Sequence, residues 1–268
     1  MNHSPPSPLL RTDADGVATL TLNTPRSMNV LSEAMLAALS AALDDIAEDR
    51  SVKAVILRSA GEHFCAGHNL KEMTARRTDP DGGLQYFKDL FATCSAMMLR
   101  IVYLPQPVIA EVKGIATAAG CQLVASCDLA VAADNASFAT SGVNIGLFCS
   151  TPMVALSRNV PRKLAMEMLL LGEFLPADRV AQMGLVNRVV PADKLEENSM
   201  AMARVIAEKS SAAVKIGKRA FYDQNEMALE EAYEFAGRVM AENMMARDAE
   251  AGIGAFTRKE PMPDWTGQ

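Results

Sequence analysis

Small residues gather in one stretch of the sequence, at a point where backbone groups could do chemistry. Residues 114–120 read GIATAAG and precede a short apolar segment that is typical of a helix. Small side chains before a helix let backbone N–H groups approach a ligand closely, and the helix dipole favours negative charge at that end. The spacing alone leaves two interpretations open. The stretch is either half of an oxyanion hole or a close-packed helix start without a ligand.

A second stretch, residues 63–73, reads HFCAGHNLKEM and follows the strand-like run Lys53–Arg58. Together the two stretches resemble the crotonase superfamily, also called the enoyl-CoA hydratase/isomerase family. That family carries an FxAGxDLxEM-like turn, a GxAxGGGxE-like helix start and then CDxxxA, and the corresponding runs here are FCAGHNLKEM, GIATAAGCQ and CDLAVA. The resemblance extends from about Val17 to Trp265. It is closest to one branch of the family, which shares the runs ATAAGCQLVASCD and GLFCSTP.

The resemblance implies an α/β fold, a crotonase-like spiral of ββα units with a C-terminal helical trimerisation region. We place a soft boundary near residue 205, which divides a spiral core, residues 1–204, from a helical region, residues 205–268. Strand-like and helical runs alternate along the core, which agrees with a mostly parallel sheet. The tail helices carry methionines and aromatic residues at helical spacings, which indicate either ordinary core or, by the resemblance, a contact between copies. A homotrimer or a dimer of trimers (homohexamer) is therefore expected.

The resemblance also assigns a site. In the family, two backbone N–H groups hold the thioester oxygen of an acyl- or enoyl-CoA substrate and stabilise the enolate that forms. Their counterparts here are His68 and Ala119. Coenzyme A enters as part of the substrate, and no separate cofactor is expected. The residues that match the coenzyme A groove, with two C-terminal positions that match the approach to its adenine end, are Ala66, His68, Asn69, Leu70, Lys71, Ala119, Phe256 and Lys259.

Two departures from the family pattern concern catalysis. Family hydratases activate a water between two glutamates, and the corresponding positions here hold Gln122 and Gly142. An amide does not exchange a proton usefully near neutral pH, and glycine has no side chain. The two-glutamate hydratase mechanism therefore cannot operate at these positions, although Gln122 could still orient water or a substrate carbonyl.

Other groups could compensate for the missing acids. Cys149 corresponds to an aspartate of the family's naphthoate synthases; near a helix N-terminus its thiol could have a lowered pKa and act as nucleophile or base, or it could be a buried, inert thiol. Ser150 matches the nucleophilic aspartate of the dehalogenase branch, but no base is evident beside it. Asp128 is expected to hold structure at a helix-to-strand turn. His68 either titrates near neutral pH or only lines its turn.

Composition narrows the remaining possibilities. The formal net charge of the 268 residues is −6, which argues against a nucleic-acid partner. No apolar run reaches the length of about 18 residues that a membrane-spanning helix needs, so no membrane contact is expected. The start, MNHSPPSPLL, has neither a secretory pattern nor the arginines of a mitochondrial transit peptide, and its paired prolines suggest a flexible lead-in.

Cysteine and histidine usage is also informative. The five scattered cysteines indicate reduced thiols in a cytoplasmic protein. No pair has zinc spacing with a nearby histidine, so no metal site is expected. His3 lies in the lead-in and His63 in a turn, which leaves no Ser–His–Asp set.

Hydrophobic periodicity predicts the elements around these motifs. Ser32 is expected to cap a helix that ends near Asp49. The polar segment Thr74–Gly83 is expected to be a mobile loop that gates acyl entry. The predicted strands are Leu9–Arg11, Val17–Leu22, Lys53–Arg58, Val108–Val112, Leu129–Ala133 and Leu185–Val190. The further predicted helices are Leu84–Tyr103, Ser150–Asn159, Arg162–Leu171, Ala177–Met183, Leu195–Lys209, Ala212–Asp223, Ala228–Arg247 and Glu250–Lys259.

Two functional hypotheses follow. The preferred one is a crotonase-fold protein of fatty-acid or related acyl-CoA metabolism that binds an acyl- or enoyl-CoA thioester and stabilises its enolate through His68 and Ala119. The resemblance makes it a lyase of the enoyl-CoA hydratase type, and the sequence leaves the reaction itself open. The alternative is a non-catalytic acyl-CoA-binding protein that keeps the groove without the acids. Turnover of crotonyl-CoA distinguishes the two. A third possibility, an interaction scaffold without ligand, requires that the groove at Ala66–Lys71 bind no coenzyme A.

Overall fold

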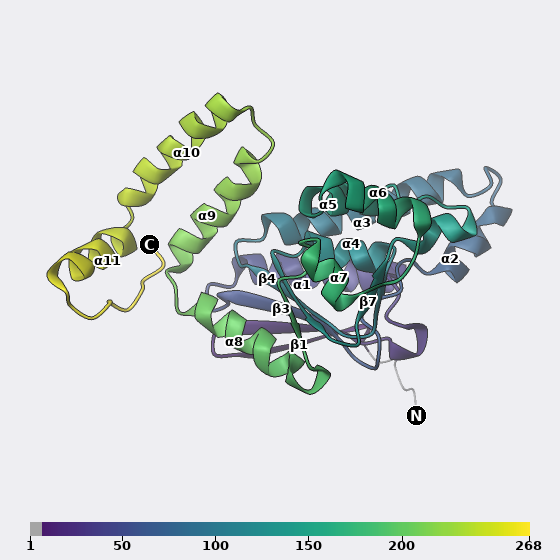
Figure 1. Ribbon diagram of the computed structural model, residues 1–268, viewed down its shortest axis with the longest axis horizontal. Coiled ribbons are helices and arrows are strands. Elements are labelled where there is room, and N and C mark those ends of the chain that lie inside the picture. The colour runs from purple at the N-terminus through teal and green to yellow at the C-terminus, as the bar shows by residue number, and fades with distance from the viewer. Residues whose placement is uncertain (1–6) are drawn as a thin grey trace.

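Nine strands form two sheets within residues 7–268, which the computed structural model describes (Figure 1). The larger sheet has six strands in the order β1-β2-β3-β4-β6-β9, and every neighbouring pair is parallel except β1 with β2. The predicted flexible lead-in and His3 lie outside the described residues. The six strands are β1 (Leu9–Ala14), β2 (Val17–Leu22), β3 (Ala54–Ser59), β4 (Val108–Val112), β6 (Leu129–Ala133) and β9 (Arg188–Val190).

The strand predictions agree with this sheet at most positions. Strands β2, β4 and β6 have the predicted bounds, and β3 is displaced by one residue. Strand β9 is shorter than the predicted Leu185–Val190. The reason is local, because the N–H of Leu185 donates to the carbonyl oxygen of Val180 in α7 (Ala177–Gln182) and so belongs to the end of that helix.

The second sheet has three strands, in the order β5-β7-β8. Along the chain, β4 is followed by β5 and then by α4 (Ala119–Ser126), and β6 is followed by β7, so successive turns give one strand to each sheet. Cys65, after β3, forms an isolated bridge with Ala116 of β5 and extends this repetition by one turn. The predicted spiral of ββα units is confirmed. The three strands are β5 (Ile115–Thr117), β7 (Ser137–Ala139) and β8 (Leu175–Pro176).

Side chains of the larger sheet alternate between two apolar layers. In β3, Val55 and Leu57 belong to one buried cluster, and Ala54 and Ile56 belong to the other. Because both faces of the sheet are covered, the strand reads as a continuous apolar run in the sequence. The second cluster lies under α8 (Leu195–Ala207).

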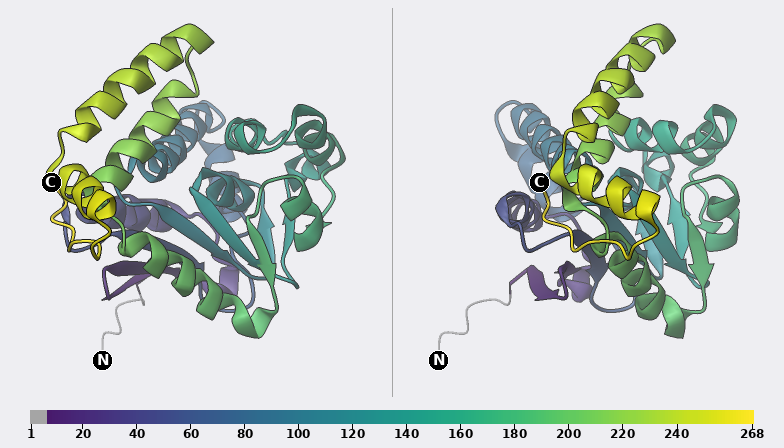
Figure 2. Two further views of the ribbon diagram at one scale, coloured as in Figure 1. Left: turned by 60° about the vertical axis from the view of Figure 1, so that its left-hand side comes forward. Right: turned by 90° about the vertical axis from the view of Figure 1, so that its left-hand side faces the viewer.

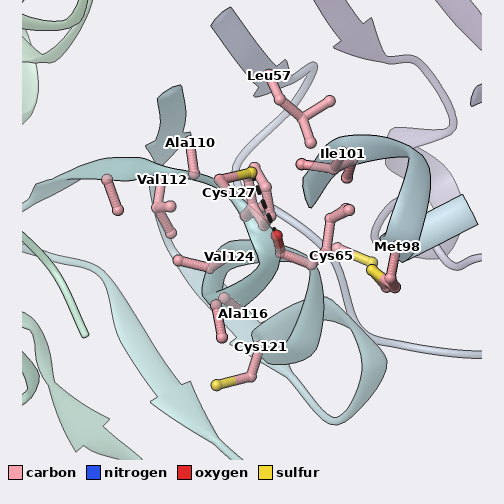
Figure 3. Packing of buried hydrophobic residues seen from close by; sticks show 14 of the residues in the cluster. Leu57, Cys65, Met98, Ile101, Ala110, Val112, Ala116, Cys121, Val124 and Cys127 are labelled. Atoms are coloured by element: carbon pink, nitrogen blue, oxygen red, sulfur yellow. Dashed lines mark hydrogen bonds between the residues drawn. The ribbon is translucent and has the colours of Figure 1, made fainter. Parts of the chain in front are cut away.

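The first cluster is the larger one and lies under α1 (Glu33–Glu48), α3 (Leu84–Tyr103) and α4. Figure 3 shows part of it, where Met98 and Ile101 of α3 face the region of α4. As predicted, Ser32 caps α1, with its hydroxyl oxygen accepting a hydrogen bond from the N–H of Met35. This cluster supports the helix start that the sequence analysis singled out.

The segment Thr74–Gly83, predicted as a loop, contains regular structure. Helix α2 (Leu70–Ala75) extends into it, and a 3₁₀ turn follows at Arg76–Thr78. The carboxylate of Asp81 then accepts hydrogen bonds from the N–H groups of Gly83 and Gln85 at the start of α3. The loop prediction is therefore wrong for residues 74–78 and agrees with the turns at residues 79–83, and the mobility of the segment and its gating of acyl entry stay predictions.

Helices α9 to α11 form what we call the C-terminal arm, residues 211–268, which projects from the rest of the chain (Figures 1 and 2). The predicted boundary near residue 205 falls inside α8, which packs on the sheet. The division into residues 1–204 and 205–268 stays a prediction. The remaining helices are α5 (Pro152–Asn159), α6 (Arg162–Leu171), α9 (Ser211–Gln224), α10 (Leu229–Met244) and α11 (Arg247–Arg258).

Asp128 fastens the arm to the core. Its carboxylate accepts hydrogen bonds from the Lys218 ammonium at 2.7 Å, the Tyr222 hydroxyl at 2.9 Å and the N–H of Val108 at 2.7 Å. Burial lowers the pKa of Lys218 and raises that of Tyr222, although the carboxylate opposes the shift at Lys218. The structural role predicted for Asp128 is confirmed.

A second carboxylate, that of Asp248 in α11, folds the end of the chain back onto the arm. It accepts hydrogen bonds from the Ser210 hydroxyl, the N–H and hydroxyl of Thr266, and the N–H of Gly267. Burial opposes ionisation of Asp248, but these hydrogen bonds outweigh it and lower its pKa to about 2. The indole N–H of Trp265 donates to the carbonyl oxygen of Glu208 and holds the same segment.

Candidate active site

The two stretches singled out in the sequence meet at one place, and two glycines make this approach possible. Gly67 has a φ of +87°, and a Cβ atom there would lie 3.1 Å from the Cβ of Ala118 and 3.2 Å from the nitrogen of Ala119. A Cβ atom on Gly120 would lie 2.1 Å from the carbonyl oxygen of Cys65. Any side chain at either glycine would therefore push the turn after β3 away from the start of α4.

Two backbone N–H groups at this junction are free. The N–H groups of His68 and Ala119 donate to no other group of residues 7–268. Ala119 is the first residue of α4, where N–H groups have no partner within the helix. Ala118, just before it, has the unusual angles φ 51° and ψ −119°. A strained alanine of this kind is typical of functional sites, where it aims neighbouring groups.

Both free N–H groups belong to residues that line a cavity of about 220 Å³, which we call the α4 cavity. Its wall is mostly apolar, and its polar side chains are hydroxyls, one thiol and one imidazole. No carboxylate, ammonium or guanidinium group of residues 7–268 lines it. The lining residues are Ala66, His68, Leu70, Met73, Phe91, Ala118, Ala119, Ser141, Gly142, Ile145, Leu147, Phe148, Cys149, Ser150, Thr151 and Pro152.

The imidazole of His68 packs edge-to-face on Phe91, with 5.5 Å between ring centroids. Both of its ring nitrogens are buried and have no hydrogen-bond partner among the described residues. Burial lowers the pKa of His68, and the nearby backbone of Leu31, too poorly placed for a regular hydrogen bond, opposes this only in part. The side chain is therefore neutral at pH 7, and one ring nitrogen keeps a free lone pair.

Gln122 and Gly142, which stand where family hydratases have their two glutamates, lie differently with respect to the α4 cavity. Gln122 is 5% exposed on α4 and does not line the α4 cavity, and its Oε1 atom has no partner among the described residues. Gly142 does line the cavity. A Cβ atom there would lie 2.3 Å from the carbonyl oxygen of Leu147 and 2.9 Å from the sulfur of Cys149. The space beside Gly142 is thus already filled.

Cys149, a catalytic candidate from the sequence, lines the cavity, and its surroundings disfavour the thiolate form. Burial raises the pKa of Cys149, and a hydrogen bond from the backbone of Gly142 opposes this only in part. Of the two interpretations of Cys149 that the sequence left open, the direction of this shift favours the buried, inert thiol, although α5 begins only three residues later, at Pro152. Ser150 also lines the cavity, and its hydroxyl donates weakly, at 3.4 Å, to the carbonyl oxygen of Phe148.

The residues matched to the coenzyme A groove fall into two groups. Ala66 and Leu70 line the cavity beside His68 and Ala119. Asn69 caps α2, with its side-chain oxygen accepting a hydrogen bond from the N–H of Lys71 at 3.1 Å. These residues form one continuous turn at the cavity.

Phe256 and Lys259 do not belong to this cavity within one chain. They lie at the end of α11 in the C-terminal arm, and Phe256 is 77% exposed. The expectation that they approach the same groove is therefore not met by a single copy of the chain.

Sequence reasoning missed most of the apolar wall. Met73 and Phe91 lie on α2 and α3, whose helical periodicity gave no sign of which half-buried positions face a cavity. The 3₁₀ turn Ser141–Ile145 and the residues after it have no periodicity to interpret. A run of apolar residues in a Gly-containing loop, IGLF at 145–148, is the signal that could have found them.

Other candidates are placed outside the cavity. The Nδ1 atom of His63 accepts a hydrogen bond from the N–H of Ile115 at 3.3 Å, so this histidine joins two segments of the spiral. In residues 7–268, no group of three or more His, Cys, Asp or Glu side chains is suited to hold a metal ion. No helix among the described residues is long and apolar enough to cross a membrane.

Comparison with known proteins agrees with this geometry. The family model for enoyl-CoA hydratase/isomerase matches residues 12–268, and the chain belongs to that family. Human enoyl-CoA hydratase domain-containing protein 3, mitochondrial, is 45% identical over 263 residues, which cover 98% of this chain and 85% of that protein. It represents the branch whose motif runs the sequence shares.

Two crystal structures show the same fold. One is described as an enoyl-CoA hydratase of Mycobacterium smegmatis, with a TM-score of 0.92 and 55% identity, and the match covers 96% of this chain and 98% of that chain. The other is human enoyl-CoA hydratase domain-containing protein 3, with a TM-score of 0.91 and 45% identity over 96% of this chain and 99% of that chain. The crotonase fold and the branch predicted from the motifs are both confirmed.

Proposed function

We propose that the chain binds an acyl- or enoyl-CoA thioester in the α4 cavity, where the N–H groups of His68 and Ala119 donate to the thioester carbonyl oxygen. The observation that carries this proposal is the pair of unpartnered N–H groups on one largely apolar cavity. Donors that are fixed before charge develops stabilise an oxyanion better than mobile water does, and each is worth about 10²–10³ in rate in known cases. The carbonyl so polarised favours enolate formation.

An enzyme of the hydratase type also needs a group that accepts a proton from the attacking water. In this proposal the His68 imidazole has that role, because it is the lining side chain whose ordinary pKa lies closest to neutrality. Both ring nitrogens are buried in the chain without substrate, so this role requires the side chain to turn one of them toward the cavity when substrate binds. The proton passes from water to the free ring nitrogen while the water oxygen bonds to the β-carbon. The electron pair of the enoyl double bond moves to the carbonyl oxygen, which the two N–H groups hold. Gln122 and Gly142 take no part in this step.

The alternative is a protein that binds acyl-CoA without turnover. One observation favours it: no carboxylate lines the α4 cavity. Both functions share the same binding geometry, so binding and turnover are measured separately.

Binding is tested by removing one N–H donor. Pro is accepted at the first position of a helix and has no N–H, so Ala119→Pro deletes the donor of α4. The positive φ of residue 118 is poorly suited to precede a proline, so the variant is made in an Ala118→Gly background, and A118G alone is the matched control. A conjugated aryl-enoyl-CoA absorbs at longer wavelength when its carbonyl is polarised. We expect a red shift on binding to A118G that is largely lost in A118G/A119P. An equal shift in both variants would contradict the proposal.

Turnover is tested with crotonyl-CoA, followed by the loss of enone thioester absorbance. If His68 accepts the proton, His68→Gln keeps the backbone N–H and loses at least about 10²-fold in kcat, with butyryl-CoA binding retained. Turnover that H68Q leaves unchanged overturns the role of the imidazole. Tight butyryl-CoA binding with no wild-type turnover establishes the non-catalytic alternative instead.

The proposal also includes association between copies of the chain through the C-terminal arm. Large apolar side chains of the C-terminal arm are exposed, among them Leu229 and Tyr233, each 74% exposed, and Met245, 85% exposed. Such a surface is typical of a contact between proteins, and a neighbouring arm would bring Phe256 and Lys259 to the groove. We infer a homotrimer or a dimer of trimers, and analytical ultracentrifugation tests it. A monomer mass at micromolar concentration would contradict this inference.

The free, buried cysteines are compatible with the reducing cytoplasm predicted from the sequence. The word mitochondrial belongs to the human relative's name. Fractionation of cells that express the protein from its own gene distinguishes the two locations.

A further inference from the structure

A second cavity, of about 450 Å³, lies at the other end of the central strands, and we call it the α9 cavity. Lys53 and Gln106, which line it, come just before β3 and β4, whereas the turn that lines the α4 cavity follows β3. The two cavities share no residue. The residues that line the α9 cavity are Ala47, Arg50, Val52, Lys53, Pro105, Gln106, Ser211, Ala212, Val214, Lys215, Thr266, Gly267 and Gln268.

Three cationic residues line this cavity, and none of them forms an ion pair with another described residue. They are Arg50, Lys53 and Lys215. The neighbouring carboxylate of Asp49 is engaged by Arg11 at 3.0 Å. Gln268, whose terminal carboxylate accepts a hydrogen bond from the N–H of Asp248, also lines the cavity. Like charges on one concavity repel one another, so an anion bound among the three cationic residues relieves part of that repulsion.

Backbone groups add to the same field. Helix α9 begins at the cavity, where Ser211 and Ala212 line the wall, and the first N–H groups of a helix attract anions. The Ser210 hydroxyl caps the helix by accepting a hydrogen bond from the N–H of Ala213. The nearby carboxylate of Asp248 is engaged by its own hydrogen bonds with Ser210, Thr266 and Gly267.

One polar group of the wall lacks a partner. The side-chain nitrogen of Gln106 donates to the carbonyl oxygens of Ile46 and Asp49, at 2.8 and 3.3 Å. Its Oε1 atom accepts no hydrogen bond from the described residues, and the residue is 7% exposed.

We propose that the α9 cavity binds a phosphorylated small molecule with at least two negative charges. Guanidinium and ammonium groups together with a helix N-terminus are the groups that proteins use for phosphate. The volume of about 450 Å³ is that of a small-molecule site. The inference does not depend on the function proposed for the α4 cavity, because neither the residues nor the ligand are shared.

Titration calorimetry with pyrophosphate at low ionic strength tests the proposal on the full chain. We expect millimolar or tighter binding, and at least about tenfold weaker binding in Arg50→Gln/Lys215→Gln, since each charged hydrogen bond is worth about that much. Both side chains are exposed, so the variant keeps its fold. The matched control is R162Q/K163Q, which removes the same charge from α6 and should change affinity by less than about twofold.

Three results would overturn the proposal. One is no heat of binding at millimolar pyrophosphate, and another is equal weakening in the two double variants, which indicates attraction to net charge alone. The third is competition by saturating butyryl-CoA, which would place pyrophosphate in the α4 cavity. Independent titration in the presence of butyryl-CoA supports the separate site, whatever the outcome of the turnover assay.

Discussion

The sulfur of Cys149 lies 2.9 Å from the place that a Cβ atom on Gly142 would take. The carbonyl oxygen of Leu147 is closer still, at 2.3 Å. The sequence shows that a family glutamate is missing at this position, and the structure shows that its place is closed. Restoring a catalytic acid by a single substitution is therefore obstructed by the backbone itself.

A side chain at Gly142 should destabilise the fold. We expect Gly142→Ala to lower the free energy of unfolding by about 1–3 kcal/mol, because the Leu147 carbonyl must move. Chemical denaturation measures this. Gly217→Ala in α9 is the control, since nothing lies within 4 Å of a Cβ there and alanine favours a helix by about 0.5–1 kcal/mol. Equal stability of G142A and wild type would show that the loop yields freely. By the same reasoning, Q122E/G142E should be poorly folded and gain no hydratase activity.

The Cys149 thiol should react slowly at neutral pH. Burial raises its pKa above the ordinary value of 9.0, so the thiolate is scarce at pH 7. We expect the rate of alkylation by iodoacetamide, followed by mass spectrometry of the Cys149 peptide, to rise throughout the range from pH 7 to 9. Cys149→Ser serves as the control and should keep butyryl-CoA binding. An alkylation rate that is already high at pH 7 and does not change up to pH 9 would show an activated thiol.

The strain at Ala118 should be measurable as stability. Its φ of 51° costs a non-glycine residue about 1–3 kcal/mol, and glycine recovers this at the expense of about 1 kcal/mol of chain entropy. We expect Ala118→Gly to be as stable as wild type or up to about 1 kcal/mol more stable. Ala139→Gly in β7, where φ is ordinary, should instead lose about 1 kcal/mol. Similar losses in both variants would mean that Ala118 stores no strain.

The ion pair between Asp128 and Lys218 should stabilise the protein far more than an exposed pair does. Their side chains are 14% and 7% exposed, so Asp128→Ala leaves a buried ammonium without its partner and should cost about 3–5 kcal/mol. Asp44→Ala, which breaks the exposed pair with Arg100, should cost less than about 1 kcal/mol. Urea denaturation compares the two. If D128A and D44A lower the free energy of unfolding by similar amounts, other contacts hold the arm on the core. Partial rescue by Lys218→Met in the D128A background would confirm the buried charge as the cause.

Acid should release the tail that Asp248 holds. The pKa of Asp248 is about 2 in the folded protein and 3.8 as the ordinary value, so ionised Asp248 contributes stability that is complete above about pH 5 and is lost as the pH falls through 3.8 toward 2. Trp265, the one tryptophan of the chain, lies on this tail and reports its release by fluorescence. We expect an acid transition in wild type and in Asp264→Asn, and its loss in Asp248→Asn. An unchanged transition in D248N would assign it to another group.

The sequence sufficed for those parts of the fold and site that depend on local chemistry. The small residues of 114–120 and of the turn after β3 were enough to predict where His68 and Ala119 meet, because a close approach of two backbone segments requires small residues. Continuous apolar runs located β3, β4 and β6 for a similar reason, since both faces of the sheet are buried.

Tertiary contacts decided what the sequence did not reveal. The burial that raises the pKa of Cys149 comes from the way residues 141–152 fold on themselves, and no spacing in the chain encodes it. The α9 cavity brings Arg50 and Lys53 to Lys215 across more than half of the sequence. The exposed position of Phe256 depends in turn on the arm projecting from its own core.

The partnership of Asp128 with Lys218 sets an order of events during synthesis. The two residues are 90 positions apart, so Asp128 leaves the ribosome long before the ammonium group that neutralises it. In that interval α4 and the strands around it can associate. The carboxylate of Asp128, just after the end of α4, then has no ammonium partner and remains hydrated. A nascent chain that stops short of α9 therefore lacks the ammonium group that neutralises Asp128, and this carboxylate stays hydrated beside the newly formed sheet.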